Sequence, residues 1–271
     1  RRHSFPTRRS SDLLLLAIPF LLASPKPMTA SMVADSENGT KVLVLNYHKV
    51  DNMNISLSVL PEDFDRQMKY LSENGYHTIT PDELYDSLAG NAELPENPVL
   101  ITFDDGYKDN YQNAYPILKK YDFKATVFVI SSFLGVYPNY LTWANVAEMQ
   151  ESGLIDFESH TLSHEELTKA PSLEEAQHQL AGSKKALEWN LGKEVRFIAY
   201  PCGEYDEDIE ELTKAAGYRA AFTVHYGLAA AKAGERALVL AAARARNPER
   251  FATNRDPKIL AIPPTAWINQ P

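Results

Sequence analysis

The chain has 271 residues, of which 44% are hydrophobic and 23% are charged, and its formal net charge at pH 7 is −9. The acidic excess argues against a nucleic-acid partner, because surfaces that bind nucleic acids are basic. The length suits two small domains or a single α/β barrel. The only cysteine, Cys202, cannot form an internal disulfide, so it leaves the redox compartment undecided.

The N-terminal part of the chain shows the features of processing and linking segments. Residues 1–13 start at Arg1 and resemble translated sequencing-adapter sequence, so we interpret them as an artefact of a fragment or a misread gene start. The apolar run 13–23 is too short to cross a bilayer as a helix and matches a signal-peptide core. A truncated membrane anchor and a buried helix are the alternatives. Residues 14–40 are therefore expected to hold this remnant and a polar linker, which predicts an extracytoplasmic protein, either secreted or associated with the cell surface, membrane or cell wall.

From Lys41 onward, strand and helix patterns alternate. Strands are predicted at 42–46, 77–80, 99–103, 125–130, 154–158, 195–200 and 218–224, and helices at 61–73, 81–88, 110–121, 142–151, 173–191 and 206–217. This alternation predicts an α/β protein with about seven parallel strands covered by helices. No Gly-x-Gly-x-x-Gly turn follows a strand, so a barrel is favoured over an open nucleotide-binding sheet. We expect one domain at 41–262, which includes a last strand at 237–240, and a loosely held tail at 263–271.

Two adjacent carboxylates follow the predicted strand 99–103. The apolar and β-branched run leads directly into Asp104 and Asp105, and Gly106 lets the chain turn. Two neighbouring acids repel each other unless a cation or a proton lies between them. A plain solvated turn would use the same residue types, so this segment alone does not establish a site.

Two histidines follow the predicted strand 154–158. His160 and His164 are four positions apart, and in a helical turn this spacing would place both imidazoles on one face, where they can share a metal ion. Two histidines and one carboxylate, with positions left open, are typical of a catalytic metal site. Two surface histidines near a helix start are the alternative. Both polar groups follow strands, which places them at the face where barrel enzymes build active sites.

Three ordered motifs together carry a family resemblance. They are Thr102-Phe-Asp-Asp-Gly106, His160-Thr-Leu-Ser-His164 and Tyr200-Pro-Cys-Gly203. In this order they resemble polysaccharide deacetylases of the NodB-homology type, carbohydrate esterase family 4. The opening Asn46-Tyr-His-Lys-Val50 is similar to the branch that deacetylates poly-β-1,6-N-acetylglucosamine. The resemblance covers 41–227 and implies a distorted (β/α) barrel that removes N-acetyl groups from a polysaccharide by metal-dependent hydrolysis.

The resemblance also implies roles for individual residues. By position, Asp105, His160 and His164 would hold one divalent metal ion, and Asp104 would be the general base. Zinc is the expected ion, and cobalt, nickel and iron also suit this ligand set. The oxyanion or the substrate would be met by the turn Tyr200, Pro201, Cys202 and Gly203, through backbone N–H groups near Cys202. The expected partner is the polysaccharide alone, bound by a monomer.

Several positions depart from the family pattern. Cys202 stands where an aromatic residue is usual, Ala199 stands where many relatives carry an arginine that orients the base, and the late Leu-x-His that supplies a general acid has no counterpart. His48 is a candidate for the missing acid, with a structural role equally open, whereas His225 is interpreted as a loop residue.

Aromatic residues and alternative functions complete the sequence-based predictions. A sugar platform is predicted from residues in or near loops after strands, namely Tyr107, Tyr111, Tyr137, Tyr140 and Trp143, although Trp143 at a helix start is also typical of a core.

A deacetylase of peptidoglycan or chitin oligomers remains open as an alternative function. So do a non-catalytic carbohydrate-binding relative and a metal hydrolase of another class, such as a phosphoesterase.

Overall fold

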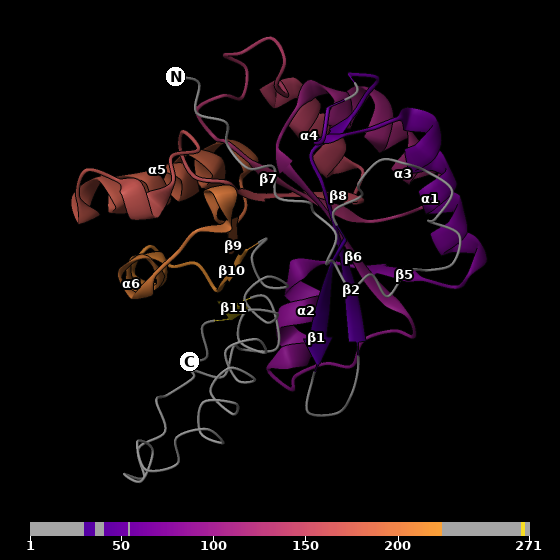
Figure 1. The fold of residues 1–271 in the computed structure, drawn as a ribbon, viewed down its shortest axis with the longest axis horizontal. Coiled ribbons are helices and arrows are strands. Elements are labelled where there is room, and N and C mark those ends of the chain that lie inside the picture. The colour runs from indigo at the N-terminus through magenta and orange to yellow at the C-terminus, as the bar shows by residue number, and fades with distance from the viewer. Residues whose placement is uncertain (1–29, 36–40, 54, 224–266, 269–271) are drawn as a thin grey trace, which may run out of the picture.

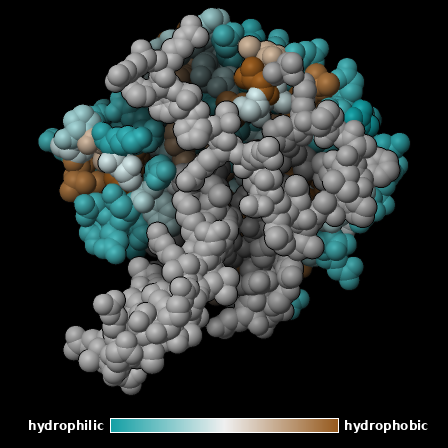
Figure 2. Space-filling model, in the orientation of Figure 1, coloured by the Kyte–Doolittle hydropathy of each residue, from teal (hydrophilic) through white to brown (hydrophobic). Residues whose placement is uncertain are grey.

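The computed structural model describes residues 30–35, 41–53, 55–223 and 267–268. Predictions for the segment 13–23, most of the linker, the strand at 237–240 and His225 lie outside the described residues. Within the described part, no helix has the length and apolar character needed to cross a membrane. On the face drawn in Figure 2, the described surface is mainly hydrophilic, and its apolar residues form small separate patches.

A nine-stranded sheet forms the centre of the protein (Figure 1). Its order is β1-β2-β6-β7-β8-β9-β10-β11, and β5 pairs with the first half of β6. The strands are β1 (Ala30–Asp35), β2 (Lys41–Tyr47), β5 (His77–Ile79), β6 (Pro98–Asp105), β7 (Ala125–Val129), β8 (Ile155–Ser159), β9 (Phe197–Ala199), β10 (Ala220–Phe222) and β11 (Trp267–Ile268).

Seven of the described strands, β2 and β5 to β10, run parallel, and β1 and β11 add antiparallel edges. The sheet curls into a half-barrel. The order of its described strands has two ends, so these strands do not close into a full barrel. The predicted α/β fold with about seven parallel strands is confirmed.

In the described part of the chain, six α-helices cover the sheet. They are α1 (Pro61–Glu73), α2 (Pro81–Leu88), α3 (Tyr115–Tyr121), α4 (Trp143–Glu151), α5 (Leu173–Leu191) and α6 (Glu207–Ala215). Their boundaries follow the expected signals: Thr142 forms a capping box at the start of α4, and Gly192 ends α5 in a left-handed conformation. The predicted helix 110–121 is divided, with a π-helix, η2 (Asn110–Ala114), before α3. Pro116 has no N–H for a regular helical hydrogen bond, which accounts for the irregular turn.

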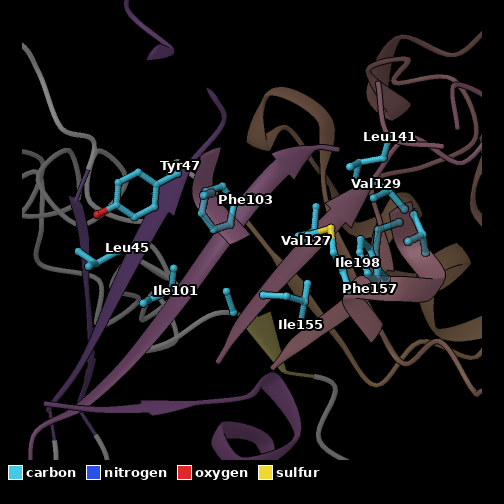
Figure 3. Packing of buried hydrophobic residues seen from close by; sticks show 14 of the residues in the cluster. Leu45, Tyr47, Ile101, Phe103, Val127, Val129, Leu141, Ile155, Phe157 and Ile198 are labelled. Atoms are coloured by element: carbon cyan, nitrogen blue, oxygen red, sulfur yellow. The ribbon is translucent and has the colours of Figure 1, made fainter. Parts of the chain in front are cut away.

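The core has two faces, because side chains alternate along each strand. Figure 3 shows the larger face, with side chains such as Leu45, Tyr47, Ile101, Phe103, Val127, Phe157 and Ile198 from β2, β6, β7, β8 and β9. Buried residues of α1, α3, α4, α5 and α6 join this cluster. The opposite face carries Leu100, which packs with Leu84 of α2, and Phe128, which packs with Ala199 of β9.

The edge strands β1 and β11, which lie in the expected linker and tail, were not predicted. Four short elements in loops were not predicted either, namely β3 (Lys49–Val50), β4 (Ser58–Val59), and the 3-10 turns η3 (Leu167–Lys169) and η4 (Pro201–Gly203). Two or three residues are too few to show a hydrophobic period. These elements lie in loops after strands of the main sheet, and β3 and η4 directly follow the ends of β2 and β9. They therefore shape the edge where the polar motifs meet.

Candidate active site at the strand ends

Three side chains that could hold a metal ion meet at the C-terminal ends of β6 and β8. Asp105, His160 and His164 each offer a ligand atom, and these atoms lie within 4.8 Å of one another. The Nε2 atoms of His160 and His164 lie 3.4 and 3.3 Å from Asp105 Oδ1. The structure thus brings together the three residues that the sequence motifs suggested as metal ligands.

The backbone at the end of β6 aims Asp105 at the histidines. In a regular strand, Asp104 and Asp105 would point to opposite faces, but Asp105 has a φ of 73° and breaks this alternation. Gly106 follows with a φ of 77°, and a Cβ atom there would lie 2.8 Å from Cγ1 of Val129. Position 106 therefore requires glycine both for its conformation and for the close approach of β7.

The ring of His160 is oriented by the backbone of β9. Its Nδ1 lies 2.8 Å from the carbonyl oxygen of Ala199, and the residue is 2% exposed. A carbonyl can only accept, so Nδ1 carries a proton, and Nε2 is the ring atom that faces Asp105. Ala199 thus contributes to the site through its main chain.

The loop between the two histidines is not helical, so the predicted reason for their proximity is wrong. Thr161 and His164 have φ values of 68° and 64°, and these left-handed residues fold the loop back. The ring centroids of His160 and His164 are 4.7 Å apart. Thr161 donates its N–H to Ser159 Oγ, and its Oγ1 accepts the His164 N–H at 3.0 Å. Its carbonyl accepts the N–H of Ser131.

The surroundings of His164 favour its neutral form. Burial lowers the pKa of His164 and the neighbouring His160 lowers it further, while Asp105 and Asp104 act in the opposite direction. A neutral imidazole is the form that coordinates a metal ion.

Asp104 is buried and only partly satisfied by hydrogen bonds. Its Oδ2 accepts a hydrogen bond of 2.9 Å from Asn46 Nδ2, and His48 Nε2 lies 3.9 Å from the same oxygen. Its Oδ1 has no hydrogen-bond partner among the described residues. A buried carboxylate oxygen without a partner indicates a place for water, an ion or a substrate. The carboxylate of Asp105 and the two imidazoles fit a divalent ion, and the free Oδ1 of Asp104 fits a water molecule next to that ion.

The segment His48–Val50 is held by side chains of the turn around η2. Asn110 Nδ2 donates to the carbonyl of His48 at 2.8 Å, and Asn113 Nδ2 donates to the carbonyl of Val50 at 2.7 Å. Asp109 accepts the last N–H of the segment and the Lys49 ammonium, both at 2.7 Å. Sequence reasoning missed these supporting residues and Asn46. The polar residues at 109, 110 and 113 begin about one helical turn after the acid pair, and this spacing could have identified them as supporting residues.

The turn after β9 lies close to the same site. The Tyr200 hydroxyl bonds Thr213 Oγ1 at 2.9 Å, so its side chain is committed to α6. Gly203 N–H donates to the Tyr200 carbonyl, and Pro201 is buried. Cys202 is exposed with a φ of 57°, and no acceptor for its N–H is present in the described part of the chain. Burial raises the pKa of the Cys202 thiol, and Asp105 is near enough to add to this effect.

The predicted aromatic platform is only partly open. Tyr107 and Tyr140 stack with ring centroids 5.0 Å apart, and Lys49 Nζ lies 4.3 Å from the centroid of the Tyr107 ring. Burial and the charge of Asp105, two positions earlier in the chain, raise the pKa of Tyr107. Trp143 begins α4 and packs against the main core. Sugar contact by Tyr107, Tyr140 and Trp143 stays a prediction.

Comparison with known proteins gives consistent matches. Residues 91–221 match the family described as polysaccharide deacetylase. A Bacillus subtilis (strain 168) protein that bears the name "Putative polysaccharide deacetylase YxkH" is 39% identical over 203 residues, which cover 75% of this chain and 71% of that protein. The poly-β-1,6-N-acetyl-D-glucosamine N-deacetylase of Staphylococcus aureus is 32% identical over 209 residues, 67% of this chain and 71% of that one. The structure of the Streptococcus pyogenes deacetylase PplD in complex with acetate aligns with a TM-score of 0.64 at 31% identity, covering 72% of this chain and 84% of PplD.

Proposed function

The chain belongs to the polysaccharide deacetylase family, and we propose that it hydrolyses N-acetyl groups of an N-acetylglucosamine polysaccharide, releasing acetate and leaving a free amine. The observation that carries this proposal is the meeting of Asp105, His160 and His164, with the buried Asp104 next to Asp105 in the chain. Poly-β-1,6-N-acetylglucosamine is the substrate we favour, since the 32% identical S. aureus protein is named for that polymer.

The site is proposed to hold one divalent metal ion, with zinc first and cobalt, nickel or iron as alternatives. Two imidazoles and one carboxylate form a set that leaves coordination positions open, which is typical of catalytic rather than structural sites. Asp104 Oδ1, which has no hydrogen-bond partner among the residues that the structure describes, supports this interpretation. When bound, such an ion supplies Lewis acidity that polarises the acetamide carbonyl and lowers the pKa of water.

Asp104 is proposed as the general base. Asn46 holds its Oδ2, so its Oδ1 is free to take the proton of the attacking water. The tetrahedral oxyanion would be met by the N–H of Cys202, for which the described residues provide no acceptor. The exposed thiol itself has no assigned step.

His48 is proposed as the general acid for the leaving amine. Its Nε2 lies 3.9 Å from Asp104 Oδ2, and one quarter of its side chain is exposed, so it can exchange protons with solvent. We also propose an extracytoplasmic location, secreted or at the cell surface, supported by the apolar run 13–23 and by a surface polysaccharide as substrate.

The test is acetate release from β-1,6-linked N-acetylglucosamine oligomers, measured with and without a chelator. Chelation should abolish release. Asp104→Asn should keep the metal and lower kcat by about 10²- to 10⁴-fold, because it removes the base. His164→Ala should lose both metal and activity.

The other outcomes separate the alternatives. Acetate release that a chelator does not change would contradict the metal assignment, and an active Asp104→Asn variant would contradict the base. Oligosaccharide binding without acetate would indicate a non-catalytic carbohydrate-binding protein. Turnover of phosphate esters would indicate another hydrolase class, and faster release from peptidoglycan or chitin oligomers would change the substrate.

A further inference from the structure

A buried glutamine of α5 reaches the loop that joins the two histidines. Gln179 is 3% exposed, although glutamine is mostly found on protein surfaces. Its Oε1 accepts the N–H of Ser163 at 3.0 Å and the Oγ–H of the same residue at 3.1 Å. Ser163 directly precedes His164, so the buried amide holds the backbone next to a proposed metal ligand.

The amide of Gln179 has one orientation that fits its neighbours. Gln179 Nε2 lies 3.1 Å from Oε1 of Glu175, one turn earlier in α5. An ionised carboxylate accepts hydrogen bonds and cannot donate them, so the NH₂ group faces Glu175 and the amide oxygen faces Ser163. The N–H of Glu175 is in turn bound by the N-cap Ser172 at 3.2 Å. The start of α5 therefore fixes the acceptor before the loop is placed against it.

The helix α5 contacts the histidine segment at two points, each directly before a histidine. Ser183 Oγ lies 2.8 Å from Oγ of Ser159, the residue before the first histidine, and Gln179 binds Ser163, the residue before the second. Ser183 and Ser159 are fully buried. The helix thus holds both ends of the loop, and the loop has no regular backbone ladder of its own.

The two proposed histidine ligands are held in different ways. The ring of His160 donates to a backbone carbonyl of β9, and its side chain is 3% exposed. The side chain of His164 is 33% exposed, and in the described residues its ring makes no hydrogen bond to the backbone. Its left-handed backbone is held instead, by Thr161 Oγ1 at its own N–H and by Gln179 at the N–H of Ser163. The direction of this ring therefore depends on these backbone hydrogen bonds.

We infer that Gln179 is a positioning residue for the proposed metal site and acts through Ser163 on the direction in which His164 presents its Nε2. This inference rests on the proposed function and its metal site, and it adds a residue of α5 to the groups that set the affinity for the ion. Without the acceptor, the N–H of Ser163 loses its partner and the loop relaxes. The folded protein would then bind the ion more weakly.

The experiment measures the zinc dissociation constant of the folded protein by competition with a chromophoric chelator. Gln179→Met keeps the length of the side chain and removes its acceptor, and it should raise this constant about 10- to 100-fold, the range usual for residues that support a metal ligand. Gln150→Met is the matched control, because Gln150 of α4 also bonds α5, at the carbonyl of Leu191 at the other end of the helix. It should leave the zinc dissociation constant unchanged, even where it lowers the free energy of unfolding.

An exchanged pair tests the direction of the hydrogen bonds. In the double variant Gln179→Glu with Glu175→Gln, an acceptor oxygen still faces Ser163 and an amide donor still joins the two side chains. This variant should recover most of the zinc affinity that Gln179→Met loses. Gln179→Asn keeps an amide but is one methylene shorter, so it should also weaken zinc binding and takes the place of Gln179→Met if that protein does not fold.

The results separate this inference from the proposed function. Zinc binding without acetate release from any glycan would contradict the proposed function, and the dissociation constants of the variants would still decide the role of Gln179. The inference is overturned if Gln179→Met binds zinc as tightly as the unaltered protein, or if Gln150→Met weakens zinc binding equally. A double variant as weak as Gln179→Met would also overturn it, and an unaltered protein that binds no zinc would overturn both proposals.

Discussion

Left-handed backbone conformations gather around the candidate site. Six non-glycine residues of the described chain have a positive φ, and four of them, Asp105, Thr161, His164 and Cys202, lie at this site. Each such residue costs about 1–3 kcal/mol unless its surroundings hold it in place. Thr161 is the least suited, because a β-branched side chain is rare in this region. Its hydrogen bonds to Ser159, Ser131 and His164 supply that support.

Asn46 is expected to position the proposed base. Its 2.9 Å hydrogen bond fixes Oδ2 of Asp104 and leaves Oδ1 directed to the reacting water. A hydrogen bond to a charged group contributes about 1.5–3 kcal/mol. If this interaction acts mainly in the transition state, Asn46→Ala should lower kcat by about 10- to 150-fold with little change in KM. Steady-state kinetics on a β-1,6-linked N-acetylglucosamine oligomer, together with the metal content of the purified protein, provide the measurement.

Two controls make the Asn46 prediction specific. Asn46→Gln keeps an amide donor one methylene further along and should recover part of the rate. Metal content should stay the same in both variants, because Asn46 contacts Asp104 and not the three ligand residues. A rise in KM at constant kcat, or loss of the metal, would assign Asn46 to substrate binding or to general structure.

At the residue scale, the sequence indicated the ligands but not their support. Asp104, Asp105 and His160 directly follow apolar strands, and this placement is visible in the residue pattern. Asn46 lies at the end of a strand too, but an asparagine there is equally typical of a plain turn. The left-handed conformations of Thr161 and His164 depend on contacts with Ser131 and Ser159, which no local pattern encodes.

At the scale of elements, hydrogen bonds from Asn110 and Asn113, at the start and just before the end of η2, hold the segment His48–Val50. Asn110 is 1% exposed and donates to the carbonyl of His48. This hydrogen bond helps to hold the His48 backbone in the position from which its Nε2 lies 3.9 Å from Asp104 Oδ2. Removing a neutral hydrogen bond costs about 0.5–1.5 kcal/mol, so Asn110→Ala should lower kcat about 2- to 12-fold. Asn113→Ala is the matched control, because it removes a similar bond to the carbonyl of Val50. Equal losses of kcat in the two variants would argue against a role in placing His48.

A second element-scale feature is the seam between β8 and β9. These strands share one paired position, Ser159 with Ile198, and the Glu158 carboxylate supplies further links. It accepts the N–H groups of Arg196 at 2.8 Å and Phe197 at 2.7 Å, and it pairs with Lys193 at 2.7 Å. The side chain thus stands in for missing ladder bonds and secures β9, whose Ala199 carbonyl orients His160.

Loss of this carboxylate should destabilise the fold strongly. Glu158 is 1% exposed, and its removal leaves the N–H groups of Arg196 and Phe197 without their acceptor, where each buried unsatisfied group costs about 1–3 kcal/mol. We expect Glu158→Ala to lower the free energy of unfolding by the cost of these two groups in urea denaturation. Asp156→Ala, which breaks a more exposed pair with the same Lys193, should cost about 0–1 kcal/mol. Similar losses in the two variants would show that the seam does not depend on the Glu158 bridge.

Element boundaries were the most predictable part of the fold. The helices at 61–73, 81–88 and 173–191 have the predicted bounds, because proline, capping side chains and glycine act locally. The split at η2 and the side-chain bridge at the β8–β9 seam were not predictable, because both depend on residues brought together by the tertiary fold.

On the scale of the whole molecule, the sequence indicated parallel strands but not how they close. Alternating strand and helix patterns predict a parallel sheet covered by helices, and the structure confirms it. The sequence pattern of a strand does not, however, show which other strand it will pair with. The sharing of one side of β6 by β5 and β7, and the single paired position between β8 and β9, distort the half-barrel in ways that only the assembled sheet reveals.

Metal removal should test how the site couples to the stability of the molecule. The proposed ligands come from β6 and from the loop after β8, so an ion would link two parts of the sheet that are over fifty residues apart in the chain. An ion at about one hundred times its dissociation constant adds about 2.7 kcal/mol to the folded state, provided that the unfolded chain does not bind it.

For a domain of this size, that stabilisation corresponds to a rise in Tm of roughly 5–10 °C, which thermal unfolding with added zinc or with a chelator would measure. In His164→Ala, zinc and chelator should give the same Tm, because one of the three ligands is gone. Trp189→Ala should retain the full difference, because Trp189 lies on the exposed surface of α5. If zinc raised the Tm of His164→Ala as much as that of the unaltered protein, the ion would be bound elsewhere, and the assignment of Asp105, His160 and His164 as its ligands would be wrong.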